Sequence, residues 1–217
     1  MSKELLKRIL SSLVLIFILG IFIIQGGIIF NLFVLICFFL TVFEWHKMSK
    51  KNSYYILGIF FLIFSYFSIY YLVNQISDDY SYFLFILLIC ISTDLGGYVV
   101  GKIIKGPKLT KLSPKKTYAG MLGGFLFSII FSNFFLDSFI FDSAIHMSVE
   151  ILIFVISISA ISQIGDLIIS YFKRISKIKD TGKLIPGHGG ILDRIDGMIF
   201  AFPFSLVIIS TNIISIF

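Results

Sequence analysis

Residues 170–196 read SYFKRISKIKDTGKLIPGHGGILDRID, and this polar stretch lies between two apolar runs, 149–172 and 196–217. A basic segment between apolar runs of about 20 residues is typical of a loop that joins membrane-spanning helices. The stretch contains six Lys/Arg residues and four glycines. Glycines let backbone N–H groups approach a ligand and cations supply charge, so the composition indicates a phosphate-binding loop. An ordinary basic cytoplasmic loop is the alternative interpretation.

Composition indicates that the whole chain is an integral membrane protein. Of the 217 residues, 58% are hydrophobic and only 14% are charged, whereas a soluble domain carries about 25% charged residues. The fold class predicted is therefore all-α, a polytopic integral membrane protein with about seven transmembrane helices. The first apolar run is expected to be a retained helix, because no A-x-A-like cleavage site follows it. The predicted helices cover residues 9–24, 28–43, 54–73, 80–101, 118–136, 149–172 and 196–217.

The Lys and Arg residues give the expected orientation. The N-terminus and the loops after the second, fourth and sixth predicted helices together hold all 18 of them. Because cationic loops stay on the cytoplasmic side, the loop 102–117 and the stretch 173–194 are expected to face the cytoplasm from the inner membrane. We divide the chain accordingly into three N-terminal transmembrane helices, residues 1–79, and a catalytic transmembrane region with two cytoplasmic loops, residues 80–217.

Carboxylates near this boundary predict a metal site. Polar residues of the sixth predicted helix recur every three or four positions and so share one face, which includes Asp166, Ser170 and Lys173. Asp193 and Asp196 follow at the beginning of the next helix. Carboxylates from two segments at one boundary suit a divalent cation, and oxygen ligands favour Mg²⁺. A helix-capping Asp193 with a structural Asp166–Lys173 ion pair is the alternative.

The lysine loop ends in a compact polar cluster at the start of the fifth predicted helix. Free backbone N–H groups at a helix start attract anions, so phosphate binding is one interpretation of this cluster. A purely topogenic basic loop is the other. The cluster consists of Ser113, Pro114, Lys115, Lys116 and Thr117.

Small residues in three predicted helices are spaced for close helix contact. They are expected to bring these helices together around Asp94 and Asp166, with Asp94 either a further ligand or a supporting group. The pairs are Gly97 with Gly101, Gly120 with Gly124, and Gly197 with Ala201.

Three blocks of this sequence resemble the phosphatidate cytidylyltransferases, also called CDP-diacylglycerol synthases. Residues 170–196 are similar, without a gap, to the family signature S-x-F-K-R, four residues, K-D-x-G, two residues, and I-P-x-H-G-G-I-x-D-R-I-D. SPKKTYAG at 113–120 resembles a second block, and residues 94–98 resemble a third. Leu95 departs from the family, which usually has a small hydroxyl residue there. The resemblance covers about residues 90–217.

The resemblance implies transfer of a cytidylyl group from CTP to phosphatidic acid, giving CDP-diacylglycerol and pyrophosphate at the cytoplasmic membrane boundary. It implies Mg²⁺ as cofactor, with Asp166 and Asp193 as metal ligands and with Lys173 and Asp196 as further catalytic groups. The expected partners are CTP, phosphatidic acid and the lipid bilayer, without nucleic acid, and a homodimer is left open. The residues expected at the substrates are Ser113, Lys115, Lys116, Thr117, Ser170, Arg174, Lys179, Asp180, His188, Gly189, Gly190 and Arg194.

Two other functions stay open. A CTP-dependent lipid kinase would use the same groups but attack the γ-phosphate of CTP. An ion-coupled transporter would need a charged site at the membrane midplane. Against the transporter, the polar groups of this sequence cluster at one boundary and no inverted repeat is visible.

Overall fold

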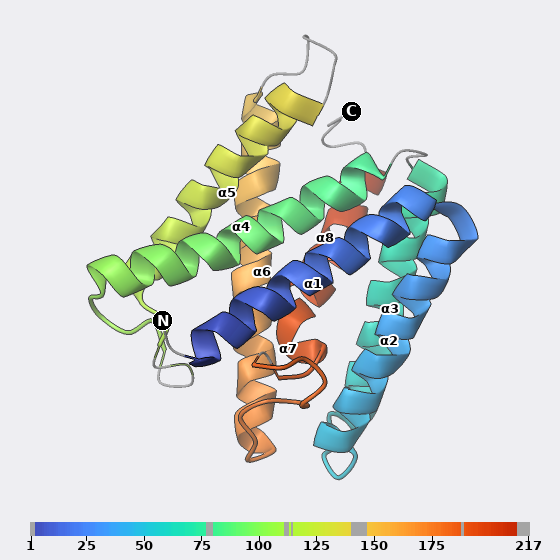
Figure 1. Ribbon diagram of the computed structural model, residues 1–217, viewed down its shortest axis with the longest axis vertical. Helices are drawn as coiled ribbons and strands as arrows, with labels where there is room; N and C mark the ends of the chain where they lie inside the picture. The colour runs from blue at the N-terminus through green and yellow to red at the C-terminus, as the bar shows by residue number, and fades with distance from the viewer. Residues whose placement is uncertain are drawn as a thin grey trace. The chain divides into compact units, whose positions relative to one another are not determined.

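The computed structural model describes residues 3–76, 80–110, 113, 115–139, 147–187 and 189–211, without the side chains of residues 3–9. Over these ranges the chain is helical and has no β-strand, only two isolated β-bridges in loops. The predicted all-α fold is confirmed. The helices (Figure 1) are α1 (Lys3–Gln25), α2 (Gly27–Ser49), α3 (Tyr55–Tyr71), the π-helical η1 (Leu72–Ile76), α4 (Ser81–Ile104), α5 (Tyr118–Phe139), α6 (Val149–Ile175), α7 (Leu192–Ile195) and α8 (Met198–Ser210).

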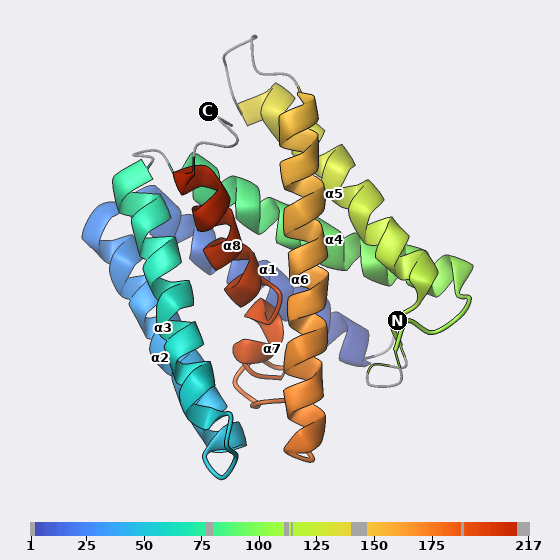
Figure 2. The same ribbon diagram turned by 180° about the vertical axis from the view of Figure 1, so that it is seen from behind.

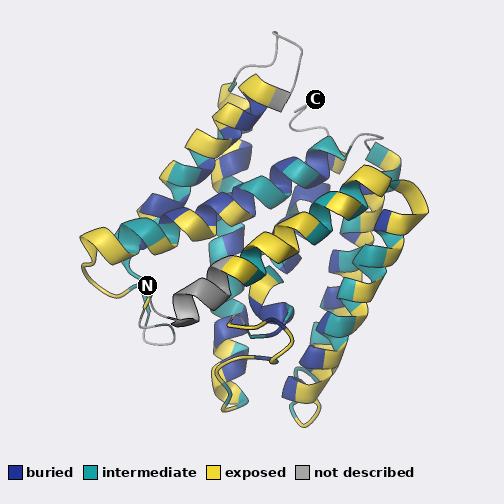
Figure 3. Ribbon diagram, viewed as in Figure 1, coloured by how far each residue is buried: buried dark blue, intermediate teal, exposed yellow. Residues whose placement is uncertain are grey.

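Five helical segments are long and apolar enough to cross a membrane: α2, α3 with η1, α4, α5 and α6. The segment Leu10–Gln25 of α1 and the whole of α8 are apolar but shorter. Exposed residues (Figure 3) run along these helices and include many large apolar side chains. Such a surface suits contact with lipid tails. The polytopic membrane fold is therefore confirmed, while the count of seven spans stays a prediction.

The turn between α1 and α2 lies where Gln25, Gly26 and Gly27 predict it. Gly26 and Gly27 have φ angles of 62° and 50°, which glycine adopts without the steric cost that a Cβ brings. The first helix therefore ends at Gln25 and the second begins at Gly27.

Several helix ends differ from the predicted ones. Helix α2 runs to Ser49, six residues past the predicted end at 43, because Glu44 and Trp45 are buried against the protein instead of facing water. Helix α6 continues to Ile175. A separate short helix, α7, precedes the predicted last helix, 196–217; within that range α8 begins at Met198, and residues 212–217 lie outside the described part of the chain.

The chain folds into two compact units. One combines the chain up to Tyr70 with Phe172–Asp196, and the other combines Tyr71–Tyr171 with the chain from Gly197 onward. The first unit holds α1, α2, most of α3, the end of α6, α7 and the loop that joins α6 to α7, residues 176–191, called the signature loop. The second unit holds most of α6 and the remaining helices. The predicted division into residues 1–79 and 80–217 concerned chemistry, which this grouping does not test.

In the first unit, the N-terminal helices hold the end of α6. Helices α2 and α3 lie side by side (Figure 2), and the short connection between them brings Trp45 and Tyr54 against Phe172. The ring centroids of Trp45 and Tyr54 lie 5.5 Å and 4.5 Å from that of Phe172. The Tyr54 hydroxyl also forms a 2.9 Å hydrogen bond with the hydroxyl of Ser176. The beginning of the signature loop is thereby anchored to the α2–α3 connection.

In the second unit, α4 and α5 approach each other at glycines. A Cβ on Gly120 would lie 2.7 Å from the carbonyl oxygen of Gly97 and 3.3 Å from the Cα of Gly101. No larger side chain fits there, which confirms the close contact predicted from the glycine spacing. Elsewhere in the unit, the buried rings of Phe85 and Phe154 stack with centroids 6.3 Å apart and join α4 to α6.

Candidate functional site

The signature loop between α6 and α7 closes on itself through glycines. The N–H of Ile185 donates a 2.9 Å hydrogen bond to the carbonyl oxygen of Gly189. Gly187 and Gly189 have φ angles of 77° and 86°. A Cβ on Gly189 would lie 2.6 Å from Oδ2 of Asp193. Backbone conformation and space therefore both require glycine at position 189.

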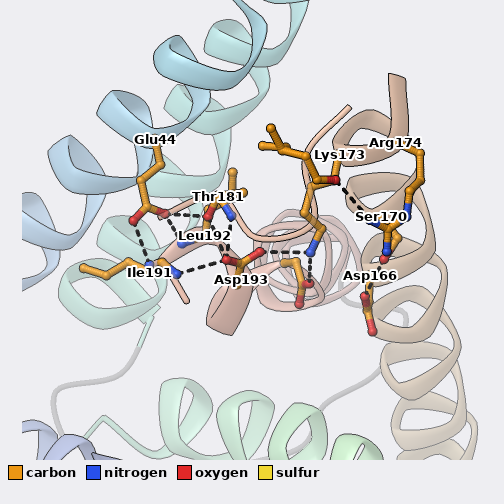
Figure 4. Close-up of polar contacts among 12 residues, drawn as sticks. Glu44, Asp166, Ser170, Lys173, Arg174, Thr181, Ile191, Leu192 and Asp193 are labelled. Carbon is orange, nitrogen blue, oxygen red and sulfur yellow. Dashed lines mark hydrogen bonds and ion pairs between the residues drawn. The ribbon is translucent and has the colours of Figure 1, made fainter. Parts of the chain in front are cut away.

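Asp193 of α7 accepts hydrogen bonds from this loop (Figure 4) and is only 7% exposed. Its Oδ2 accepts hydrogen bonds from the N–H of Thr181 at 2.7 Å, from the Thr181 hydroxyl at 3.0 Å and from the N–H of Gly190 at 2.9 Å. Its Oδ1 accepts a 2.9 Å hydrogen bond from Nζ of Lys173. One carboxylate thus ties the end of α6 to both sides of the loop.

The electrostatics keep Asp193 ionised. Burial raises the pKa of Asp193, but hydrogen bonds from Gly190, Lys173 and Thr181 and the charge of Lys173 outweigh burial and lower the pKa below the ordinary value of 3.8. Lys173 is itself buried, and its Nζ lies 3.7 Å from Oδ2 of Asp196. A single ammonium therefore bridges two carboxylates at the base of the loop.

Glu44 of α2, which sequence analysis did not select, completes this network. It is 2% exposed; its Oε1 accepts the N–H of Ile191 at 3.1 Å, and its Oε2 accepts the N–H of Leu192 and the Thr181 hydroxyl, both at 2.9 Å (Figure 4). One signal in the sequence could have pointed to it. Glu44 is the only acidic residue within 5–77, and it directly follows an apolar run.

Asp166 belongs to the second unit and has different partners. Its Oδ2 forms an ion pair with Nζ of Lys116, and its Oδ1 accepts a 3.3 Å hydrogen bond from the Ser170 hydroxyl. The Asp166 side chain is 24% exposed, so it is more open than that of Asp193. The structure thus brings together one residue of the SPKKT cluster and the polar face of α6. The alternative pairing of Asp166 with Lys173 is wrong, because each has another partner.

The SPKKT cluster, residues 113–117, directly precedes α5, at the helix start where it was predicted. The hydroxyl oxygen of Thr117 accepts a 3.1 Å hydrogen bond from the N–H of Gly120, which caps the helix. The N–H of Lys116 donates to the carbonyl oxygen of Ser113 at 3.0 Å. Pro114 lies outside the described residues. Thr117 therefore has a structural partner, and phosphate binding by this cluster stays a prediction.

Residues 51–212 match the cytidylyltransferase family. The chain belongs to this family. It is 35% identical over 209 residues to the phosphatidate cytidylyltransferase of Rickettsia bellii, and this alignment covers 93% of this chain and 89% of that protein. It is 35% identical over 214 residues to the protein of the same name from Rickettsia felis, 93% of this chain and 91% of that one. A third relative of that name, from Staphylococcus epidermidis, is 41% identical over 132 residues, 58% of this chain and 48% of that protein.

Family membership confirms the predicted resemblance and corrects its extent. The match begins at residue 51 rather than near residue 90. The Rickettsia relatives align over 93% of the chain, so the likeness also includes N-terminal helices that lie outside the predicted range.

The other predicted substrate residues have diverse surroundings. The N–H of Gly190 donates to Asp193, and the Arg174 guanidinium donates a 3.0 Å hydrogen bond to the carbonyl oxygen of Ile178. His188 lies outside the described residues. The predicted substrate contacts stay predictions for all of these positions. The side chains of Lys115, Arg174, Lys179, Asp180 and Arg194 are all exposed.

The donor set fits a magnesium ion in part. The described residues contain no group of three or more His, Cys, Asp and Glu side chains that could hold a metal. Carboxylate oxygens are nevertheless the ligands that Mg²⁺ prefers, with water completing its coordination. Each predicted ligand also pairs with an ammonium group: Asp166 with that of Lys116 and Asp193 with that of Lys173. Because Oδ2 of Asp193 already accepts three hydrogen bonds, Oδ1 is its oxygen that suits a metal.

Proposed function

We propose that this chain transfers a cytidylyl group from CTP to phosphatidic acid, as the names of its relatives suggest. In this reaction a phosphate oxygen of phosphatidic acid bonds to the α-phosphorus of CTP. The bond from that phosphorus to the β-phosphate oxygen breaks, and pyrophosphate leaves. The observation that carries the proposal is the closed signature loop. Lys173, Thr181 and Gly190 hold Asp193 there as an ionised carboxylate, and the side chains of Lys179 and Arg194 are exposed.

The chain's own residues serve mainly to bring two polyanions together. A phosphate monoester has a second pKa of about 6, so phosphatidic acid is largely ionised at neutral pH and needs no strong general base. The exposed side chains of Arg174, Lys179 and Arg194 supply positive charge around the loop. Buried Lys173 instead orients Asp193 and Asp196.

We assign Mg²⁺ to carboxylate oxygens of Asp166 and Asp193, the two ligands predicted from the sequence. When bound, the ion would neutralise phosphate charge and polarise the reacting phosphoryl group. In the structure, Nζ of Lys116 pairs with Asp166 and Nζ of Lys173 pairs with Asp193.

Incubation of the purified protein with phosphatidic acid and CTP labelled at the α-phosphate tests the proposal. Label should enter the lipid, with one pyrophosphate released per lipid labelled. A parallel reaction with γ-labelled CTP should leave the lipid unlabelled. Lipid labelling from the γ-position would identify a lipid kinase instead, and no transfer from either position would refute a CTP-dependent activity on this lipid.

The proposal includes the membrane orientation predicted from charge, with both basic loops at the cytoplasmic face of the inner membrane. There the soluble nucleotide and the lipid can meet. In a chain lacking Cys37 and Cys90, single cysteines at Lys108 and Lys183 should resist membrane-impermeant labelling of intact cells. Both should react after permeabilisation. Labelling of either cysteine in intact cells would overturn the orientation.

A further inference from the structure

Glu44 is a buried carboxylate that the reaction proposed above does not use. It lies in α2, outside the signature and outside the matched residues 51–212. Its hydrogen-bond donors are the backbone N–H groups of Ile191 and Leu192 and the hydroxyl of Thr181. Burial of a carboxylate costs free energy unless its oxygens accept hydrogen bonds. The hydrogen bonds therefore hold Thr181, Ile191 and Leu192 in place as well as Glu44.

Two glycines of the signature loop are shaped to the Glu44 side chain. A Cβ on Gly182 would lie 2.5 Å from Oε1 of Glu44, and a Cβ on Gly190 would collide with the same carboxylate group. Neither glycine has the positive φ that would by itself favour glycine. The close approach of Glu44 therefore accounts for glycine at both positions.

Thr181 connects Glu44 to Asp193. Its hydroxyl oxygen lies 2.9 Å from Oε2 of Glu44 and 3.0 Å from Oδ2 of Asp193. A hydroxyl carries one hydrogen, so the two carboxylates share a single donor. Glu44 also holds the N–H of Leu192, the residue that directly precedes Asp193. Movement of Glu44 would thus displace Asp193 through two separate links.

We propose that Glu44 is a positioning residue for cytidylyl transfer. Its carboxylate joins Thr181 to the Ile191–Leu192 backbone and so fixes the conformation in which the loop presents Asp193 and its cations. The inference rests on the proposed function for its kinetic consequence, but the holding of the loop can be measured without turnover. Glu44 acts through these neighbours and does not contact either substrate.

The kinetic test compares Glu44→Gln and Glu44→Ala with Glu150→Gln. Glu150 is an exposed carboxylate in the first turn of α6 and supplies a control with the same change of charge. We expect kcat per folded enzyme to fall at least tenfold in Glu44→Gln and further in Glu44→Ala, with a severalfold rise in KM for CTP. Glu150→Gln should match the wild type. A merely structural Glu44 would lower only the folded fraction, leaving both constants of the folded enzyme unchanged, and that result would overturn the proposal.

Hydrogen exchange supplies the readout that is independent of turnover. In Glu44→Gln, the amides of Thr181, Ile191 and Leu192 should exchange at least tenfold faster, whereas the amide of buried Ile89 in α4 should be unaffected. Unchanged exchange in the loop would refute the positioning role. If the wild type forms no CDP-diacylglycerol but loop exchange still rises in the variant, the proposed reaction fails while the positioning of the loop stands.

Thr181→Val serves as a second variant should the Glu44 variants fail to insert. It removes the shared hydroxyl and leaves both carboxylates in place. The expected pattern is the same, with lower kcat and higher KM for CTP. Wild-type kinetics in Thr181→Val would show that the two carboxylates are not coupled through this hydroxyl and would overturn the proposal.

Discussion

Replacement of Asp193 by Asn is the sharpest perturbation of the signature loop. The carboxamide keeps the shape of the side chain but has only one acceptor oxygen. If that oxygen accepts the N–H groups of Thr181 and Gly190, the amide NH₂ group faces the ammonium of Lys173, so a donor meets a donor. Rotation of the amide would transfer the conflict to the two backbone N–H groups. Neither orientation satisfies the four hydrogen bonds that Asp193 accepts.

The free-energy cost of this substitution depends on the burial of the ion pair and on the second carboxylate that Lys173 retains. Removal of one partner of a buried ion pair typically costs about 3–5 kcal/mol. Lys173 retains Asp196, at 3.7 Å, as a second carboxylate, so we expect the lower end of that range. A loss of about 3 kcal/mol corresponds to roughly a hundredfold rise in the population of open loop. Such a loss is a large share of the total of about 5–15 kcal/mol that stabilises a typical protein.

Asp166→Asn provides the matched comparison, because Asp166 is partly exposed and its partner Lys116 lies outside the signature loop. We expect both substitutions to reduce CDP-diacylglycerol formation by several orders of magnitude, but only Asp193→Asn to accelerate amide exchange at Thr181 and Gly190. If the two carboxylates share one magnesium ion, the double variant should be little worse than either single one. The assay is product formation against magnesium concentration, with loop exchange measured in parallel. Near-normal activity with unchanged magnesium dependence in either single variant would refute the shared ion. Unchanged exchange in Asp193→Asn would refute the role of Asp193 in holding the loop.

Three further predictions concern neighbouring groups. Gly190→Ala, which drives a Cβ into the Glu44 carboxylate, should destabilise the loop by about 1–3 kcal/mol in amide exchange, whereas Gly20→Ala, with no atom within 4 Å of the new Cβ, should not. In metal-free protein, the lowered pKa of Asp193 means that its contribution is complete above about pH 4 and is lost as pH falls through the folded value. The protection of the Thr181 amide, relative to its intrinsic exchange rate at the same pH, should therefore fall only in acid, and Asp193→Asn should lack that transition. Replacing both Lys115 and Lys116 by Gln should raise KM for CTP severalfold in the folded enzyme, and an unchanged KM would leave that loop a topogenic role only.

Local pattern was enough to predict the fold class and the polar face of α6. Membrane helices follow from apolar runs. The four-residue spacing of Asp166 and Ser170 puts their side chains next to each other on one helix face, and the structure has a hydrogen bond between them. Helix ends were harder to predict where a polar residue is buried in protein. The run before Glu44 ended, by hydropathy, at residue 43, yet α2 continues because Glu44 faces the signature loop instead of water.

Ion-pair partners could not be predicted from the sequence, because they depend on which segments the fold brings together. Helical spacing suggested Asp166 with Lys173, whereas Lys116, fifty positions earlier in the chain, pairs with Asp166. Lys173 is then available to Asp193 and Asp196. The residue types of the site were thus predictable, but not which cation neutralises which carboxylate.

The contribution of α2 to the signature loop has a general physical cause. The first backbone N–H groups of any helix lack partners within it, and α7 is too short to form more than a single turn. Its preceding residue Ile191 and its first residue Leu192 direct their N–H groups to Glu44. A cap from within the loop would have fixed α7 only to its own neighbours. A carboxylate from α2 instead ties the conformation of the loop to a membrane helix that precedes it by about 140 residues, so the N-terminal helices contribute directly to the closed form of the loop.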